Sequence, residues 1–331
     1  MPLPVVDDAT PLFIVLNAGS GKLDASVTRA TIETVLGEAG RPHEVLEVKE
    51  AARLQDTARR ALGKARERGG AVVAAGGDGS LNTIAGVVLG SGCAFGVVPL
   101  GTFNYFARTH GIPTDTAEAA RSLLDAVVRP VQVGLINDRL FLVNASLGLY
   151  PQLLEDRETY KQQYGRSRWV AFIAGLISLL REHRQLRIRL ERPGGTRSIR
   201  TPTLFVGNNR LQLEQIGIDQ AALIEHGQLA AITLRPVGWL SMLGLLVSGA
   251  LGRLGDADNV FAFGVDRMTV RQALRYGPKR VKVATDGEIV WLKMPLELRV
   301  SPEPLYLLAP RSPVFEGARA DRSDGAAAPD S

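Results

Sequence analysis

The first half of the chain alternates short apolar runs with longer stretches whose apolar residues recur at helical spacing. The expected strands are residues 12–16, 44–48, 72–75 and 95–98, and the expected helices are residues 25–38 and 54–68. A short apolar run is typical of a buried strand, whereas apolar residues three and four positions apart indicate a helix. Repeated strand-helix units of this length predict a parallel sheet covered by helices. Ligands bind such sheets at the carboxyl ends of the strands.

The pattern changes after Val127, where short strand-like segments take over. These are residues 131–135, 140–144, 186–190, 203–206, 229–234, 268–270, 281–284 and 296–300. Turn signals such as Asn137-Asp138 and Asp286-Gly287 separate many of them, which predicts a mainly antiparallel second domain. We therefore expect an α/β domain over residues 9–130, which residues 303–310 could rejoin, and a β-rich domain over 131–302. The small, polar residues 311–331 are expected to form a flexible tail.

Composition agrees with two globular domains, because 45% of the 331 residues are hydrophobic and 22% are charged. The single cysteine, Cys93, excludes an internal disulfide and a metal site built from cysteines. A lone cysteine fits a reducing compartment, and the first residues lack the basic stretch and apolar run of a signal peptide. We expect a cytoplasmic protein.

Charge is concentrated in one region. Residues 157–200 hold eleven Lys or Arg and three Glu, although the whole chain carries only +5. Within this region an apolar run, residues 169–180, is too short to span a bilayer, which needs roughly 20 residues. Arginines on both sides and a terminal tryptophan are typical of a segment at a lipid interface. The predicted membrane contacts are Arg166, Arg168, Trp169, Arg181 and Arg184.

A core helix with solvated ends is the alternative for this run and for a similar one, residues 239–251. Nucleic acid is the other partner that a basic patch suggests. We do not expect it here, because the segment lacks interleaved aromatic residues and any recognisable nucleic-acid module.

The strand at residues 72–75 runs into Gly76, Gly77, Asp78 and Gly79 and then into a helix. Glycines let the backbone approach a ligand closely, and a helix start presents free N–H groups and a positive dipole end to phosphate. A carboxylate would repel bare phosphate unless Mg²⁺ stood between them. The turn therefore predicts a site for a metal-nucleotide, although Asp78 could also be only a helix cap.

Two more loops follow expected strands, at residues 17–22 and 99–104. The first is not a P-loop, because Leu16 and Leu23 stand where that motif needs Gly and Ser or Thr. Each loop alone could be a simple turn. Since the carboxyl ends of parallel strands share one edge of a sheet, we expect both loops to lie beside the Gly76 turn.

Four motifs in this order resemble the diacylglycerol kinase catalytic family, which includes bacterial diacylglycerol kinases and sphingosine and ceramide kinases. They are residues 17–22 (NAGSGK), 76–82 (GGDGSLN), 99–108 (PLGTFNYFAR) and 285–288 (TDGE). The resemblance covers residues of about 10 to 308. It implies an ATP-dependent lipid kinase with an α/β domain like that of phosphofructokinase and NAD kinases. A β-sandwich domain is expected to complete the active-site cleft.

The resemblance also assigns roles to individual residues. It places ATP against Asn17, Ser20, Gly21, Lys22, Gly76, Gly77, Asp78, Gly79, Ser80, Leu81, Asn82, Thr102 and Asn104. Asp78 is expected to act in catalysis by meeting the Mg²⁺ carried by ATP. Glu288 is expected to be the catalytic base, and Asp286 could share or take that role. By itself the Asp286-Gly287 pair would indicate only a β-turn.

Two positions depart from the bacterial pattern. Tyr105 stands where an aspartate usually follows Asn104, and His226 stands where an aspartate helps to hold a structural Mg²⁺. Because imidazole is a poor ligand for this cation, we expect that auxiliary metal to be absent, although Glu225 could keep a weaker site.

The sequence thus favours an enzyme at the membrane surface that moves the γ-phosphate of ATP to a lipid hydroxyl. Diacylglycerol is the leading acceptor by its frequency in the family. The alternatives are a soluble kinase resembling NAD kinase and a catalytically inactive lipid-binding protein.

Overall fold

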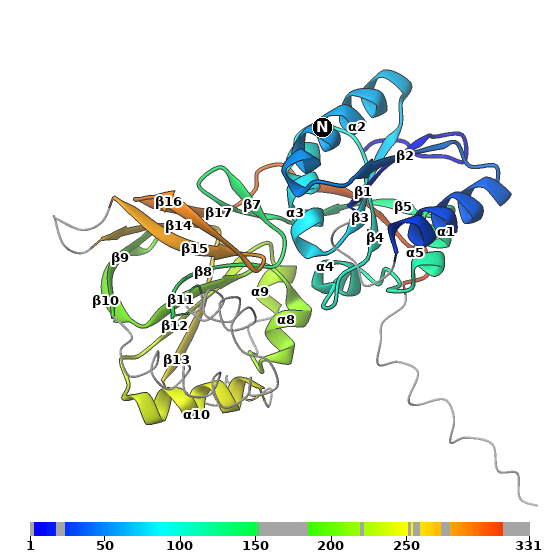
Figure 1. Ribbon diagram of the computed structural model, residues 1–331. Coiled ribbons are helices and arrows are strands. Elements are labelled where there is room, and N and C mark those ends of the chain that lie inside the picture. The colour runs from blue at the N-terminus through cyan, green and yellow to red at the C-terminus, as the bar shows by residue number, and fades with distance from the viewer. Residues whose placement is uncertain are drawn as a thin grey trace, which may run out of the picture. The chain divides into compact units, whose positions relative to one another are not determined.

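The computed structural model describes residues 3–17, 24–149, 151, 185–218, 222–250, 253, 259–272 and 279–313 (Figure 1). The chain divides into two compact units. Unit 1 is formed by the residues up to Pro130 and from Tyr306 onward, and unit 2 by Val131–Leu305. Within the described part of the chain, no helix combines the length and the apolar character needed to cross a bilayer.

Unit 1 is built on a six-stranded sheet in the order β2-β1-β3-β4-β18-β5. Its strands are β1 (Leu12–Asn17), β2 (His43–Val48), β3 (Ala71–Gly76), β4 (Phe95–Pro99), β5 (Val127–Val131) and β18 (Leu305–Ala309). The pairs β1–β2, β1–β3, β3–β4 and β4–β18 are parallel. Every residue of β3 is buried, as expected for a parallel strand covered on both faces.

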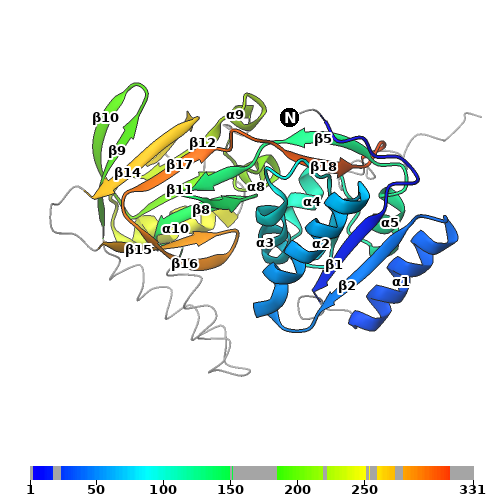
Figure 2. The same cartoon turned by 90° about the horizontal axis from the view of Figure 1, so that it is seen from above.

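Helices cover both faces of this sheet. They are α1 (Ala25–Glu38), the short η1 (Ala51–Arg53), α2 (Leu54–Arg68), α3 (Asp78–Val88), α4 (Tyr105–Thr109) and α5 (Thr116–Ser122). α1 packs against α5, and α2 packs against α3 (Figure 2). Since β-α-β crossovers are right-handed, connections that run in opposite directions along the sheet lie on opposite faces. The α1–α5 pair therefore covers one face and the α2–α3 pair the other.

In the part of unit 2 that the structure describes, antiparallel strands dominate and three helices lie beside them. Its elements are β6 (Gly134–Ile136), β7 (Arg139–Phe141), β8 (Asn144–Gly148), β9 (Leu186–Arg192), β10 (Gly195–Thr201), β11 (Thr203–Gly207), α8 (Arg210–Gln215), α9 (Ala222–Glu225), β12 (Leu229–Leu234), α10 (Trp239–Ala250), β13 (Val260–Val265), β14 (Arg267–Gln272), β15 (Arg280–Thr285), β16 (Glu288–Lys293) and β17 (Leu296–Val300). The strands form two six-stranded sheets, ordered β10-β9-β14-β17-β6-β7 and β13-β12-β11-β8-β15-β16.

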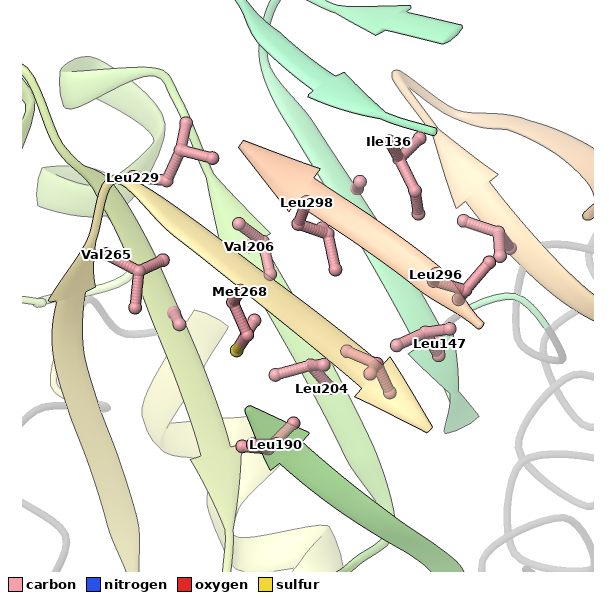
Figure 3. Close-up of a cluster of buried hydrophobic side chains, with 14 of the residues drawn as sticks. Ile136, Leu147, Leu190, Leu204, Val206, Leu229, Val265, Met268, Leu296 and Leu298 are labelled. Atoms are coloured by element: carbon pink, nitrogen blue, oxygen red, sulfur yellow. The ribbon is translucent and has the colours of Figure 1, made fainter. Parts of the chain in front are cut away.

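The two sheets of unit 2 share one apolar core. Met268 and Leu298 point into it from the first sheet, and Leu204, Val206 and Leu147 point into it from the second (Figure 3). In β9, β14 and β17, alternate residues are buried in this way, because successive side chains of a strand face opposite sides of the sheet. The intervening residues form the outer faces.

The mixed architecture predicted from the sequence, α/β followed by antiparallel β, is confirmed in this coarse form. Residues 25–38 and 54–68 are helices with the predicted bounds. The specific likeness of unit 1 to phosphofructokinase and NAD kinases stays a prediction.

Two strand predictions in the second half were wrong. Residues 131–135 join the end of β5 to β6, and residues 140–144 contain the break between β7 and β8. In both places two short strands follow each other so closely that their apolar residues merge into one run. β10, β13 and β16 were not predicted. In β10, for example, only Ile199 is a large apolar residue.

Candidate functional site

The glycine turn of unit 1 lies where β3 leads into α3. Gly76 ends the strand, Gly77 is the N-cap residue and Asp78 begins the helix. The first helical hydrogen bond runs from the N–H of Leu81 to the carbonyl of Gly77, at 3.0 Å. The backbone N–H groups of the residues just before Leu81 lie in the first turn, ahead of this hydrogen bond. The positive end of the helix dipole lies at the same place. This is the geometry that binds phosphate.

The loop after β4 lies directly against this turn. The N–H of Leu100 donates to the carbonyl of Gly76 at 2.9 Å. A Cβ atom added to Gly101 would lie 3.0 Å from the Cα of Gly77 and 2.8 Å from Oδ1 of Asn104. Only a residue without a side chain allows the two backbones to come this close. The Gly76 turn and the Gly101 loop therefore form one continuous backbone surface, as the sequence predicted.

Asn104 closes its own loop. Its Oδ1 accepts from the N–H of Gly101 at 3.0 Å, and its Nδ2 donates to the carbonyl of Gly101 at 3.1 Å. The residue is buried and adopts a left-handed conformation with φ of 49°, which asparagine tolerates better than most residues. Asn104 thus shapes the loop. Its predicted direct contact with nucleotide stays a prediction, as does that of the exposed Thr102.

Asn17 reaches the same place from the end of β1. Its Nδ2 donates to Oγ of Ser80 at 2.8 Å, which joins two residues that the sequence assigned to nucleotide binding. Ser80, Leu81 and Asn82 are all buried, so these side chains hold the start of α3 in place. The neighbouring predicted contacts Ser20, Gly21 and Lys22 lie outside the described residues.

An aromatic pair follows the Gly101 loop. The rings of Phe103 and Tyr105 stack with centroids 5.7 Å apart and planes 6° apart, and Phe103 is exposed. Burial raises the pKa of Tyr105, the charge of Arg108 opposes this, and the negative charge of Asp78 adds to it. Tyr105 therefore lies close enough to Asp78 to interact with its charge, at the position where the bacterial pattern has an aspartate.

In unit 2, the acidic motif forms the turn between β15 and β16. Asp286 adopts a left-handed conformation with φ of 47°. Its carboxylate accepts three backbone hydrogen bonds, from Leu142 at 2.7 Å and from Val143 and Asn144 at 2.9 Å each. Its own N–H donates to the carbonyl of Asn144 at 3.0 Å. Both carboxylate oxygens are engaged in holding the chain between β7 and β8.

This geometry gives Asp286 a structural role, because its three backbone hydrogen bonds fix the turn. Its possible part in proton transfer, which the sequence left open, stays a prediction. The sequence did not indicate the structural role, because the donors lie more than 140 positions away.

Glu288 lies two residues further on, at the start of β16. Its side chain is half exposed, and Oε2 lies 3.2 Å from Nη2 of Arg139 on β7. Burial raises the pKa of Glu288, the positive charge of Arg139 opposes this, and the nearby Asp286 raises it further. A carboxylate that holds a proton more readily than usual is suited to act as a general base. The assignment of Glu288 as the catalytic base stays a prediction, and the structure places Arg139 beside it.

Arg139 and the buried Asn208 were not among the residues predicted from the sequence. Asn208 donates from Nδ2 to the carbonyl of Leu142 at 3.0 Å, so it holds the same segment as Asp286. Neither residue belongs to a recognisable motif. Only the turn signal at Asn137-Asp138, just before Arg139, marked this part of the chain.

His226 and its neighbour Glu225 both make polar contacts within unit 2. Nδ1 of His226 lies 2.8 Å from the carbonyl oxygen of Ala222, and the adjacent Glu225 forms an ion pair with Arg210. Among the described residues, no group of three or more His, Cys, Asp or Glu is arranged to hold a metal. The predicted membrane contacts Arg166, Arg168, Trp169, Arg181 and Arg184 lie outside the described residues.

Comparison with known proteins confirms the resemblance that the motifs predicted. Residues 11–136 match the family model of the diacylglycerol kinase catalytic domain. A protein of Cronobacter sakazakii named "Probable lipid kinase YegS-like" is 30% identical over 140 residues, which are 41% of this chain and 45% of that protein. A diacylglycerol kinase of Bacillus subtilis is 38% identical over 88 residues, or 26% of this chain and 29% of the relative.

Among longer matches, an uncharacterized protein of Synechocystis is 25% identical over 246 residues, covering 72% of this chain and 54% of that protein. The chain thus spans about half of the length of the curated relatives that it matches first. A solved structure of a diacylglycerol kinase from Bacillus anthracis superposes with a TM-score of 0.64, at 18% identity. The superposition covers 92% of this chain and 98% of that one. At this identity the likeness shows a shared fold.

Proposed function

We propose that this chain, whose residues 11–136 belong to the diacylglycerol kinase catalytic domain family, is a lipid kinase that transfers the γ-phosphate of ATP to a lipid hydroxyl. The observation that carries the proposal is the glycine turn at the start of α3, held against the Gly101 loop by the hydrogen bond from Leu100 to Gly76. Two backbones in contact with no side chain between them leave room for phosphates at a helix start. The names of the relatives support a lipid as acceptor.

The residues present fit Mg·ATP. A Cβ atom at Gly101 would fill the contact with Gly77, so the cradle exists only with glycine there. Asp78 supplies a carboxylate oxygen of the kind that Mg²⁺ prefers. We propose that the backbone N–H groups at the start of α3 bind phosphate oxygens and that Asp78 orients the metal. When bound, the metal would neutralise charge on the transferring phosphoryl group.

Unit 2 is proposed to supply the base. Glu288 would accept the proton of the acceptor hydroxyl, while Arg139 holds the Glu288 carboxylate in one orientation by their 3.2 Å contact. In phosphoryl transfer most of the rate acceleration comes from positioning and electrostatic stabilisation. The role of Asp286 is therefore to keep the turn that carries Glu288 in a fixed conformation through its three backbone hydrogen bonds.

Diacylglycerol is the acceptor that we propose first, because a similar protein of Bacillus subtilis is named diacylglycerol kinase. Incubation of the protein with Mg²⁺, γ-labelled ATP and a total membrane lipid extract tests this. Label should enter a lipid, and Asp78→Ala should abolish the labelling. Label that enters NAD when both acceptors are present would instead support a soluble kinase. Absence of any labelled product would support an inactive lipid-binding protein.

A further inference from the structure

Among the described residues of unit 2, six arginines lie on the outer face of the first sheet, which we call the arginine face. They are Arg187 and Arg189 on β9, Arg200 on β10, Arg267 and Arg271 on β14, and Arg299 on β17. Their strand neighbours Ile188, Leu190, Met268, Val270 and Leu298 point into the core. Since side chains alternate along a strand, the arginines point the other way. Figure 1 shows β9, β14 and β17 side by side.

The arginines face each other across neighbouring strands. The register pairs Arg187 with Arg200, Arg189 with Arg271, and Arg267 with Arg299. Like charges directly opposite each other in an antiparallel sheet are destabilising. This arrangement occurs three times on the face, so each pair carries a repulsion that a nearby negative charge would offset.

Among the described residues, two glutamates reduce the repulsion at one side of the face. Glu191 contacts Nε of Arg271 at 2.9 Å, and Glu297 contacts Arg267 at 2.8 Å and Arg299 at 4.0 Å. At the other side, the residues directly opposite Arg187 and Arg189 are Arg200, Ser198 and Arg271, none of them acidic. The positive charge is thus concentrated at Arg187, Arg189 and Arg200, all of which are exposed.

We propose that the arginine face is a docking surface for the anionic phosphate groups of a phospholipid membrane. Every cation on it is arginine, whose planar guanidinium binds phosphate with two parallel hydrogen bonds. The choice of a membrane rests on the proposed function, because a lipid acceptor lies in one. None of the six arginines is among the membrane contacts that the sequence predicts between Arg166 and Arg184.

The shape and composition of the face favour a membrane over nucleic acid. From β10 to β17 it is four strands wide, or about 14 Å from the first strand axis to the last. That exceeds the roughly 12 Å width of a DNA major groove, which admits only a helix or a two-stranded ribbon. The outward residues of these strands include no aromatic side chain on which an unpaired base could stack.

The test is co-sedimentation of the full chain, without nucleotide, with vesicles of equal parts phosphatidylglycerol and phosphatidylcholine. Each arginine near an anionic surface strengthens binding about fivefold. The triple variant R187Q/R189Q/R200Q should therefore partition on the order of a hundredfold more weakly than the unmodified chain. The matched control R53Q/R59Q/R66Q, which removes the same charge from exposed positions of η1 and α2, should stay within about twofold.

A second readout separates docking from a structural role. Because the triple variant loses like-charge repulsion, its thermal unfolding midpoint should equal or exceed that of the unmodified chain. A lower midpoint, unchanged partitioning, an equal loss in the control, or equal binding to phosphatidylcholine alone would overturn the proposal. So would binding to duplex DNA without binding to the anionic vesicles.

Failure of the kinase proposal would look different. A chain that binds the anionic vesicles through these arginines but labels no lipid would leave the docking surface intact and remove the enzyme assignment. A chain that phosphorylates a short-chain acceptor in solution but does not bind the vesicles would keep the enzyme assignment and remove the docking surface.

Discussion

The two turns assigned to chemistry are built in different ways. In unit 1, the Gly76 turn joins a buried strand to a helix, and its shape depends on local glycines and on a loop about 25 residues away. In unit 2, the Asp286 turn is a hairpin that owes its conformation to hydrogen bonds with a segment more than 140 positions earlier. Chemistry that follows from local backbone shape can be recognised in a sequence, whereas chemistry that follows from long-range pairing cannot.

The largest effect is expected at Glu288. Replacing it with Gln keeps its size but removes the proton acceptor, and general-base catalysis contributes about 10²- to 10⁴-fold to a rate. We expect kcat for lipid phosphorylation to fall by that range in Glu288→Gln. The exposed Glu303→Gln in the same unit should leave kcat unchanged. Full activity in Glu288→Gln would remove this residue from the mechanism.

The second largest effect is expected at Asp286, whose carboxylate binds the segment between β7 and β8. Asp286→Ala leaves three backbone N–H groups without their acceptor, and a lost hydrogen bond to a charged group costs about 1.5–3 kcal/mol. We expect the free energy of unfolding, measured by urea denaturation, to fall by roughly 3 kcal/mol. The exposed Asp138→Ala, in the turn between β6 and β7, should change it by less than about 0.5 kcal/mol. Equal effects at both positions would mean that the three hydrogen bonds are unimportant.

A smaller effect is expected in the glycine turn. In Gly101→Ala, the new methyl group would lie 2.8 Å from Oδ1 of Asn104 and 3.0 Å from the Cα of Gly77, so one loop must move. Overpacking of this kind costs about 1–3 kcal/mol, and we expect ATP affinity to fall by about tenfold or more. Gly86→Ala is the control, because nothing lies within 4 Å of the added methyl group there. Unchanged ATP affinity in Gly101→Ala would show that the contact between the two loops does not shape the site.

The smallest effect concerns Arg139. Its positive charge opposes the burial and the Asp286 charge that raise the pKa of Glu288, so Arg139→Gln should raise that pKa further. A base must be deprotonated to act, and the acidic limb of the kcat/KM profile should therefore move to higher pH. At neutral pH the loss should be about fivefold or less, because the ion pair is half exposed. A profile that moves to lower pH would contradict this arrangement.

Local signals were sufficient for most of unit 1. The buried runs before Asn17 and Gly76 identified β1 and β3, and the glycine motif located the start of α3. They also brought Asn17 and Ser80 to one place, because parallel strands end at the same edge of a sheet. The closing role of Asn104 could not be read from the motif, since it depends on the left-handed conformation of that residue.

In unit 2, fewer elements could be predicted from the sequence, for a physical reason. Strands of a few residues, such as β6 and β7, leave no periodic pattern long enough to separate them. The contact of Arg139 with Glu288 depends on how these short strands are arranged with β15 and β16. The pairing of Arg187 with Arg200 depends likewise on the register of a hairpin whose second strand, β10, was not predicted.

The central claim is that the glycine turn at the start of α3 binds Mg·ATP, and calorimetric titration of ATP with and without Mg²⁺ tests it most directly. The account predicts that the unmodified chain and Glu288→Gln bind ATP equally well when Mg²⁺ is present. It also predicts that Asp78→Ala binds at least about tenfold more weakly and no longer responds to Mg²⁺. Equal Mg²⁺-dependent affinity in Asp78→Ala, or no ATP binding by the unmodified chain, would contradict it.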